Sequence, residues 1–102
     1  MNNDNLSQQS KQMSICEEAD KIVTNDRQAS YGTPAENFRI TADMLNAAGF
    51  CFRGGKLKAE DVGLMMILVK AARQSFKHKR DSLVDICGYA KCIDMILTEK
   101  QT

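Results

Sequence analysis

The sequence predicts an all-α fold, a four-helix bundle-like domain that assembles into an oligomer. Three observations predict this class. Apolar residues recur at spacings of three and four, no segment alternates strongly between apolar and polar residues, and the chain contains one proline and six glycines. Its 102 residues, 11.4 kDa in mass, correspond to one helical domain over residues 11–102, preceded by a flexible polar arm over residues 1–10.

The first expected helix is amphipathic and runs from Lys11 to about Asn25. The ten residues NDRQASYGTP at 25–34 are rich in turn-forming types, so we interpret them as a connection. The second helix has a clear start, with Thr33 as N-cap, Pro34 at the first helical position and Glu36 in a capping box.

The second helix should end in a left-handed turn at Gly49, and FCFRGGK should form a flexible loop. The third helix is expected from Ala59 to Phe76. Its segment VGLMMILV is apolar on every side, so we expect part of its surface to be buried between subunits. The fourth helix is expected to have Asp81 as its N-cap and to reach about Thr98.

The overall charge is nearly balanced, with 14 basic and 13 acidic residues and a net charge of +1. We therefore expect no direct binding to nucleic acid and no membrane association, and any charged partner must be recognised locally. No apolar run approaches the roughly 20 residues that cross a bilayer, and the N-terminus lacks a secretion signal. A cytoplasmic location follows, where the four cysteines should be reduced and act as small buried hydrophobes.

Basic residues gather between Lys70 and Arg80, where no acidic residue lies. Two interpretations remain open for them. Cations near the C-terminus of a helix interact favourably with its dipole, which requires no ligand. Alternatively, Lys70, Arg73 and Lys77 bind phosphate, because a guanidinium grips phosphate oxygens in a two-pronged fashion and ammonium groups add mobile charge.

Asp81 and Asp85 lie four residues apart, so on a helix their carboxylates project from one face. In the structural interpretation, Asp81 caps the helix, Asp85 favours its first turn, and nearby cations neutralise both. In the functional interpretation, the pair binds Mg²⁺ beside the cations that hold phosphate. Because Asp85 lies between Val84 and Ile86, its carboxylate is expected to need a partner.

The segment RQASYGTPAENF offers contacts for a nucleotide. Tyr31 could stack on a base, Asn37 has the donor and acceptor needed to read a base edge, and Arg27 could offset phosphate charge. Phe38 lies on the apolar stripe and is expected to pack in the core.

Two glycines lie inside expected helices, where each costs about 1 kcal/mol relative to alanine. Gly63 and Gly88 are therefore expected to allow close contact between helices. At Gly88, the alternative is space for a ligand beside Asp85 and Tyr89.

Together these residues resemble a family of short phage and prophage proteins described as similar to MazG. The likeness covers roughly Ala19 to Leu97 and is carried mainly by three motifs, R-x-x-x-Y-G-x-x-x-x-N-F at 27–38, K-x-x-R at 70–73 and D-x-x-x-D-x-x-G-Y at 81–89. Enzymes of this kind carry E-x-x-E and E-x-x-D pairs. The nearest equivalents in this chain are Glu17 with Asp20 and, at a spacing of four, Asp81 with Asp85.

The resemblance implies an oligomeric, magnesium-dependent pyrophosphohydrolase that converts a (deoxy)nucleoside triphosphate to its monophosphate and pyrophosphate, in the host cytoplasm if a phage encodes it. Two rival hypotheses are a non-catalytic protein that sequesters a nucleotide and a helical module that binds a host protein. The site implied by the resemblance and the residue patterns comprises catalytic metal ligands Asp81 and Asp85 with Glu36 as a third ligand, phosphate-binding Arg27, Lys70, Arg73 and Lys77, and nucleoside-binding Tyr31, Asn37 and Tyr89.

Overall fold

The computed structural model describes residues 12–101, without the side chains of Asp26 and Gln101. The predicted arm at residues 1–10 and the predicted helix start at Lys11 lie outside this range. The described residues are helical, as expected, and contain no strand beyond an isolated bridge between Phe52 and Gly55.

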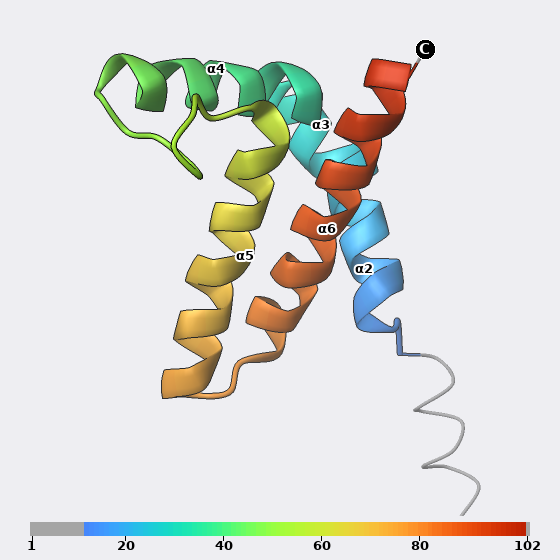
Figure 1. The fold of residues 1–102 in the computed structure, drawn as a ribbon. Helices are drawn as coiled ribbons and strands as arrows, with labels where there is room; N and C mark the ends of the chain where they lie inside the picture. Colours follow the sequence, from blue (N-terminus) through green and yellow to red (C-terminus); the bar gives the residue numbers. More distant parts are fainter. Residues whose placement is uncertain (1–11, 102) are drawn as a thin grey trace, which may run out of the picture.

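The described residues form four helical stretches, which confirms the all-α prediction. Figure 1 shows α6 between α2 and α5, with α5 antiparallel and α2 parallel to it, while α4 lies across the end where α5 begins and α6 ends. The first stretch is continuous from α2 through η1 to α3. The elements are α2 (Ile15–Lys21), the π-helix η1 (Ile22–Arg27), α3 (Gln28–Tyr31), α4 (Pro34–Ala47), α5 (Ala59–Phe76) and α6 (Arg80–Gln101).

The predicted connection at residues 25–34 is wrong for residues 25–31, because the first helical stretch continues as far as Tyr31 and only Gly32 and Thr33 separate it from α4. Val23 is buried and Arg27 lies among aromatic rings, and this packing outweighs the turn-forming composition. Gly32, at φ +80°, then ends the stretch in a conformation that other residues rarely adopt. At the other end, the Ser14 hydroxyl accepts a hydrogen bond from the Glu17 amide at 3.1 Å and starts the helix after Lys11.

Both predicted ends of α4 are confirmed. The Thr33 hydroxyl accepts a hydrogen bond from the Glu36 amide at 3.2 Å and donates one to the Glu36 carboxylate at 2.9 Å. At the C-terminus, Gly49 adopts φ +95° and the amide of Phe50 bonds the carbonyl of Leu45 at 3.0 Å, which forms a Schellman motif.

The segment between α4 and α5, predicted to be a flexible loop, is tied by two sets of hydrogen bonds. Phe52 and Gly55 exchange backbone hydrogen bonds of 2.9 and 3.0 Å around a tight turn. Asn46 bonds both backbone groups of Leu57, accepting from its amide at 2.8 Å and donating to its carbonyl at 2.9 Å. We call this pair of bonds the Asn46–Leu57 clamp.

Helix α5 begins and ends where the sequence predicts. Its buried face includes Gly63, where a Cβ atom would overlap Ile93 of α6, with Cδ1 only 2.9 Å away; this confirms the expected close contact. Apolar side chains on its remaining surface, by contrast, are 40–92% exposed: Leu64, Leu68, Val69 and Phe76. Burial of that surface between subunits stays a prediction.

Helix α6 begins at Arg80, two residues before Ser82, the first helical residue predicted, so Asp81 is not its N-cap. The amide of Ser82 bonds the carbonyl of Lys79 at 3.0 Å, which places Asp81 within the first turn. The helix also extends beyond Thr98 to Gln101.

The core lies where α4, α5 and α6 meet, and it contains Phe38, as predicted, with Val62 and Ile96. The expected burial of the cysteines is correct only for Cys92 among the four free thiols. None of the helices in the described part of the chain is long and apolar enough to cross a membrane.

Candidate functional site

A hollow of about 750 Å³ opens at the turn between α5 and α6. We call it the α5–α6 hollow. The end of α5 and the start of α6 line it. The two helices are antiparallel, so the short turn between them brings the predicted cations and carboxylates together. Its lining residues are Lys70, Ala72, Arg73, Phe76, Lys77, Lys79, Asp81, Ser82 and Asp85.

The α5–α6 hollow therefore contains three of the four predicted phosphate-binding residues and both predicted catalytic aspartates. Sequence reasoning left Lys79 and Phe76 out of the site. Lys79 belongs to the same run of cations, which was the available signal, whereas Phe76 was expected only to end a buried helix and is instead 92% exposed.

Asp85 has the partner that its sequence position predicts. The Lys70 ammonium lies 2.9 Å from its carboxylate, and the Lys70 side chain is only 16% exposed, against 39% for Asp85. Because the pair is half-shielded from water, each charge holds the other in place across the helix interface. The ammonium thus supplies positive charge directly at Asp85.

The other cations of the α5–α6 hollow are less constrained. Arg73, Lys77 and Lys79 are exposed and form no ion pair with another described residue. Four cationic groups face two carboxylates, so the hollow has an excess of positive charge. The start of α6 adds the positive end of a helix dipole, which also favours an anion.

Arg27 lies outside the α5–α6 hollow, although it was predicted to bind phosphate. Its guanidinium is 5.4–5.6 Å from the ring centroids of Tyr31, Phe38 and Tyr89. Arg27 and Tyr89 line a separate small pocket that also contains Asp85. Arg27 is thus a neighbour of the site and contacts three aromatic faces.

The three predicted nucleoside-binding residues do not form one surface. Tyr31 is 62% exposed, whereas Tyr89 is half-buried and packs against Phe38 with ring centroids 6.2 Å apart. Asn37 lies in the first turns of α4 and lines neither the α5–α6 hollow nor the pocket beside Arg27. The hollow therefore lacks the nucleoside contacts that the sequence predicted.

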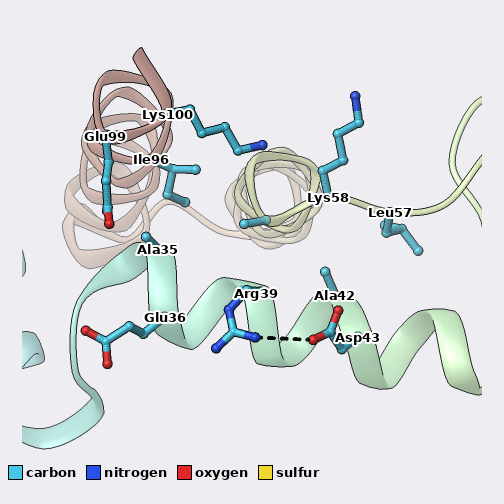
Figure 2. Close-up of a pocket in the computed structure, with 11 residues that line it drawn as sticks. Ala35, Glu36, Arg39, Ala42, Asp43, Leu57, Lys58, Ile96, Glu99 and Lys100 are labelled. Carbon is cyan, nitrogen blue, oxygen red and sulfur yellow. Dashed lines mark ion pairs between the residues drawn. The ribbon is translucent and has the colours of Figure 1, made fainter. Parts of the chain in front are cut away.

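Glu36 is not placed with Asp81 and Asp85. Its carboxylate accepts the hydrogen bond from Thr33 and lines a second pocket, of about 510 Å³, at the opposite end of the α5–α6 pair. Figure 2 shows this pocket between α4 and the ends of α5 and α6. Its capping contact with Thr33 keeps Glu36 at the start of α4.

A complete metal centre is not formed by one copy of the described chain. Among the side chains that the structure describes, which exclude that of Asp26, no three of His, Cys, Asp or Glu gather closely enough to hold a metal ion. Asp20, one of the nearest acidic equivalents on the first helix, instead forms an ion pair with Lys91. A magnesium ion in the α5–α6 hollow would have only Asp81 and Asp85 as carboxylate ligands and would share Asp85 with Lys70.

Comparison with known proteins identifies relatives among phage proteins. The chain is 38% identical over 87 residues to the Gene 55 protein of Mycobacterium phage D29. This alignment covers 84% of this chain and 55% of that protein. It is 37% identical over 83 residues to the Gene 55 protein of Mycobacterium phage L5. This alignment covers 80% of this chain and 51% of that protein. The chain thus spans about half the length of these relatives.

These matches confirm the expected relation to phage proteins, and none of them is linked to MazG. No solved structure matches the chain significantly. A match to the domain of unknown function DUF6378 covers residues 14–97, which include every residue of the α5–α6 hollow. The chain belongs to the DUF6378 family.

Proposed function

We propose that the protein binds a nucleoside triphosphate, with the phosphates in the α5–α6 hollow. The observation that carries this proposal is the gathering of four cationic side chains around one hollow at the start of a long helix. A triphosphate bears several negative charges, and its size suits a hollow of about 750 Å³. In a phage-encoded protein, such binding would take place in the host cytoplasm.

Each group in the α5–α6 hollow has a distinct part in this proposal. Arg73 would grip two phosphate oxygens in a planar, two-pronged contact, and Lys77 would follow the phosphates as a mobile charge. The Lys70 side chain is already held by Asp85, so placing its ammonium beside a phosphate would cost little further side-chain entropy.

Arg73→Glu is the sharpest test of the proposed site, because it reverses an exposed charge that has no described ion-pair partner. Calorimetric titration with ATP, GTP, CTP, UTP and their deoxy forms should detect binding to the unmodified protein. The variant should bind at least about tenfold more weakly, since a charge-assisted contact is lost and repulsion is added.

Arg39→Glu is the matched control, since Arg39 is an exposed arginine on α4 that lines the pocket at the opposite end. It changes the net charge by the same amount and should leave the affinity nearly unchanged. Equal weakening by both variants would show that binding follows overall charge, and the α5–α6 hollow would lose its role.

Magnesium-dependent pyrophosphohydrolysis is the second candidate function, and the presence of Asp81 and Asp85 in the same hollow favours it. Magnesium binds through one or two carboxylates with phosphate oxygens and water, so these two side chains are a partial fit. The ion would polarise the phosphoryl group under attack. Lys70, Arg73 and Lys77 would offset the charge on the phosphates, with Lys70 released from Asp85.

Pyrophosphate release separates the two candidates. Hydrolysis requires release with magnesium, and Asp85→Asn should abolish it while the helical circular dichroism signal is retained. Binding alone predicts no release but a higher melting temperature with nucleotide. A protein that shows neither response would contradict both candidates and favour a helical module that binds a host protein.

We also propose self-association through the exposed apolar surface of α5. Leu68 is 66% exposed at its centre, flanked by Leu64 and Val69 at 40% each. An apolar surface of this kind typically marks an interface. Light scattering should detect an oligomer, and Leu68→Lys should shift it toward the monomer; an unchanged mass would contradict this interface.

A further inference from the structure

Two thiols face each other across the contact between α2 and α6. The Sγ atoms of Cys16 and Cys87 lie 3.7 Å apart, and both residues are free cysteines. Cys16 is exposed and Cys87 is half-buried. The pair is therefore close enough to react and open enough to be reached by a small molecule in water.

The sulfur atoms are held in this position by contacts that do not involve sulfur. Asp20 and Lys91 each lie four residues beyond a cysteine of the pair, and they form an ion pair one turn along the same parallel helices. At Gly88, a Cβ atom would lie 3.5 Å from Val23 and 4.0 Å from Ala19, so the α6 backbone lies close to the first helical stretch. Folding thus gives the two thiols a high effective concentration.

We propose that Cys16 and Cys87 form an oxidation site, which a small-molecule disulfide such as oxidised glutathione converts to an intramolecular disulfide. The Cys16 thiol loses its proton to water, and its thiolate attacks one sulfur of the oxidant, which releases one glutathione thiolate. Cys87 then loses its proton and attacks the Cys16 sulfur, which releases the second. Two protein thiols are oxidised, and one glutathione disulfide is reduced to two thiols.

The order of the two steps follows from the exposure of Cys16 and the raised pKa of the Cys87 thiol. Burial, together with the hydrogen bond and charge of Cys16, raises the pKa of the Cys87 thiol. The exposed Cys16 thus meets the oxidant first, and Cys87 resolves the mixed disulfide. Burial also raises the pKa of the Cys92 thiol, which is enclosed in the core, while Cys51 lies in the segment between α4 and α5.

Peptide mapping tests this proposal directly, because trypsin places each cysteine on its own peptide. The purified protein would be incubated with oxidised glutathione, its remaining thiols alkylated, and the digest analysed without reduction. We expect a monomer that has lost two hydrogen atoms, with peptide 12–21 joined to peptide 81–91. Cys51 and Cys92 should carry the alkyl group or, at Cys51, a glutathione adduct.

Two serine variants and a melting curve complete the design. Cys16→Ser should remove the cross-link. Cys51→Ser, which lacks a thiol outside the pair, should retain it, and this control distinguishes loss of the pair from a general loss of thiol reactivity. The oxidised protein should melt roughly 5–10 °C above the reduced one, because the bridge closes a long loop. Separate glutathione adducts on Cys16 and Cys87 in the folded protein, or a cross-link no more abundant than in urea, would overturn the proposal.

Discussion

At the end of the α5–α6 pair where α4 crosses, Phe38, Val62 and Ile96 are at most 5% exposed, and the Asn46–Leu57 clamp fixes the chain beside them. At the turn end, only Ser82 among the hollow's residues is buried, and cations outnumber carboxylates. The same two helices thus serve two purposes. Burial of apolar side chains stabilises the fold at one end, whereas the cations at the other end are available to bind a ligand. Stability and binding should therefore respond to different substitutions.

The largest loss of stability is expected from Phe38→Ala at the packed end. Phe38 is 2% exposed, and removal of its ring would leave a cavity among the core residues. The free energy of unfolding should fall by about 3–5 kcal/mol, measured by urea denaturation. A loss below about 1 kcal/mol would show that the core does not depend on this end.

The two helical glycines sharpen the comparison with one matched change. Gly63→Ala places a methyl group against Ile93 and should destabilise the protein by about 1–3 kcal/mol. Gly88→Ala meets only ordinary contacts with Val23 and Ala19, so the gain in helix propensity should make it neutral or stabilising by up to about 1 kcal/mol. Urea denaturation of both variants checks the order, and the reverse order would contradict the described helix contacts.

A third prediction concerns the turn end, where Lys70→Met should change binding more than stability. The variant keeps most of the buried stem of Lys70 but removes its ammonium from Asp85. Unfolding free energy should fall by about 1 kcal/mol or less, because Asp85 retains contact with water. Nucleotide affinity should fall about tenfold in calorimetry.

The double variant Lys70→Met/Asp85→Asn is the control for the loss of the ion pair. It removes the unpaired carboxylate that the single change leaves behind, so stability should recover. Nucleotide binding should recover only in part. Complete recovery of both properties would mean that Lys70 serves the fold alone.

The smallest effect is expected from Glu60→Gln at the packed end. Burial alone would raise the pKa of Glu60, but the hydrogen bond from Lys100 at 2.7 Å, a backbone hydrogen bond and the charges of Lys100 and Lys58 outweigh it and hold the pKa below its usual value. A lowered folded-state pKa stabilises the protein above the unfolded-state pKa, and this contribution is lost as the pH falls through the folded-state value. Urea denaturation should show a deficit of less than about 1 kcal/mol near pH 7 that disappears in acid.

The predictable parts of the fold were those fixed by local chemistry. The Thr33 cap, the left-handed Gly49 and both ends of α5 depend on neighbouring residues, and the sequence contains those directly. The helical structure of residues 25–31 could not be predicted, because it depends on packing of Arg27 against the rings of Phe38 and Tyr89 on other helices. No local pattern contains that contact.

The candidate site was predicted in part for the same reason. Lys70 and Asp85 meet because one short turn joins their helices, a relation that sequence order nearly dictates. Glu36 and Asn37 are on α4, which crosses the far end of the pair, and only the tertiary arrangement decides where α4 lies. Residues joined by a tight turn can thus be grouped from sequence, whereas those separated by a crossing helix cannot.

The Asn46–Leu57 clamp has a practical consequence for experiments on this protein. Because two hydrogen bonds join Asn46 to Leu57, the residues between them form a closed loop in which Phe52 packs against the core while Cys51 and Gly54 are exposed. Figure 1 shows the segment between α4 and α5 at the opposite end of α5 from the α5–α6 turn. A fluorophore on the exposed thiol of Cys51, in a variant whose other exposed cysteine, Cys16, is replaced by serine, or a short peptide tag inserted beside Gly54 would lie in this closed loop. The molecule therefore carries its own attachment point for immobilisation.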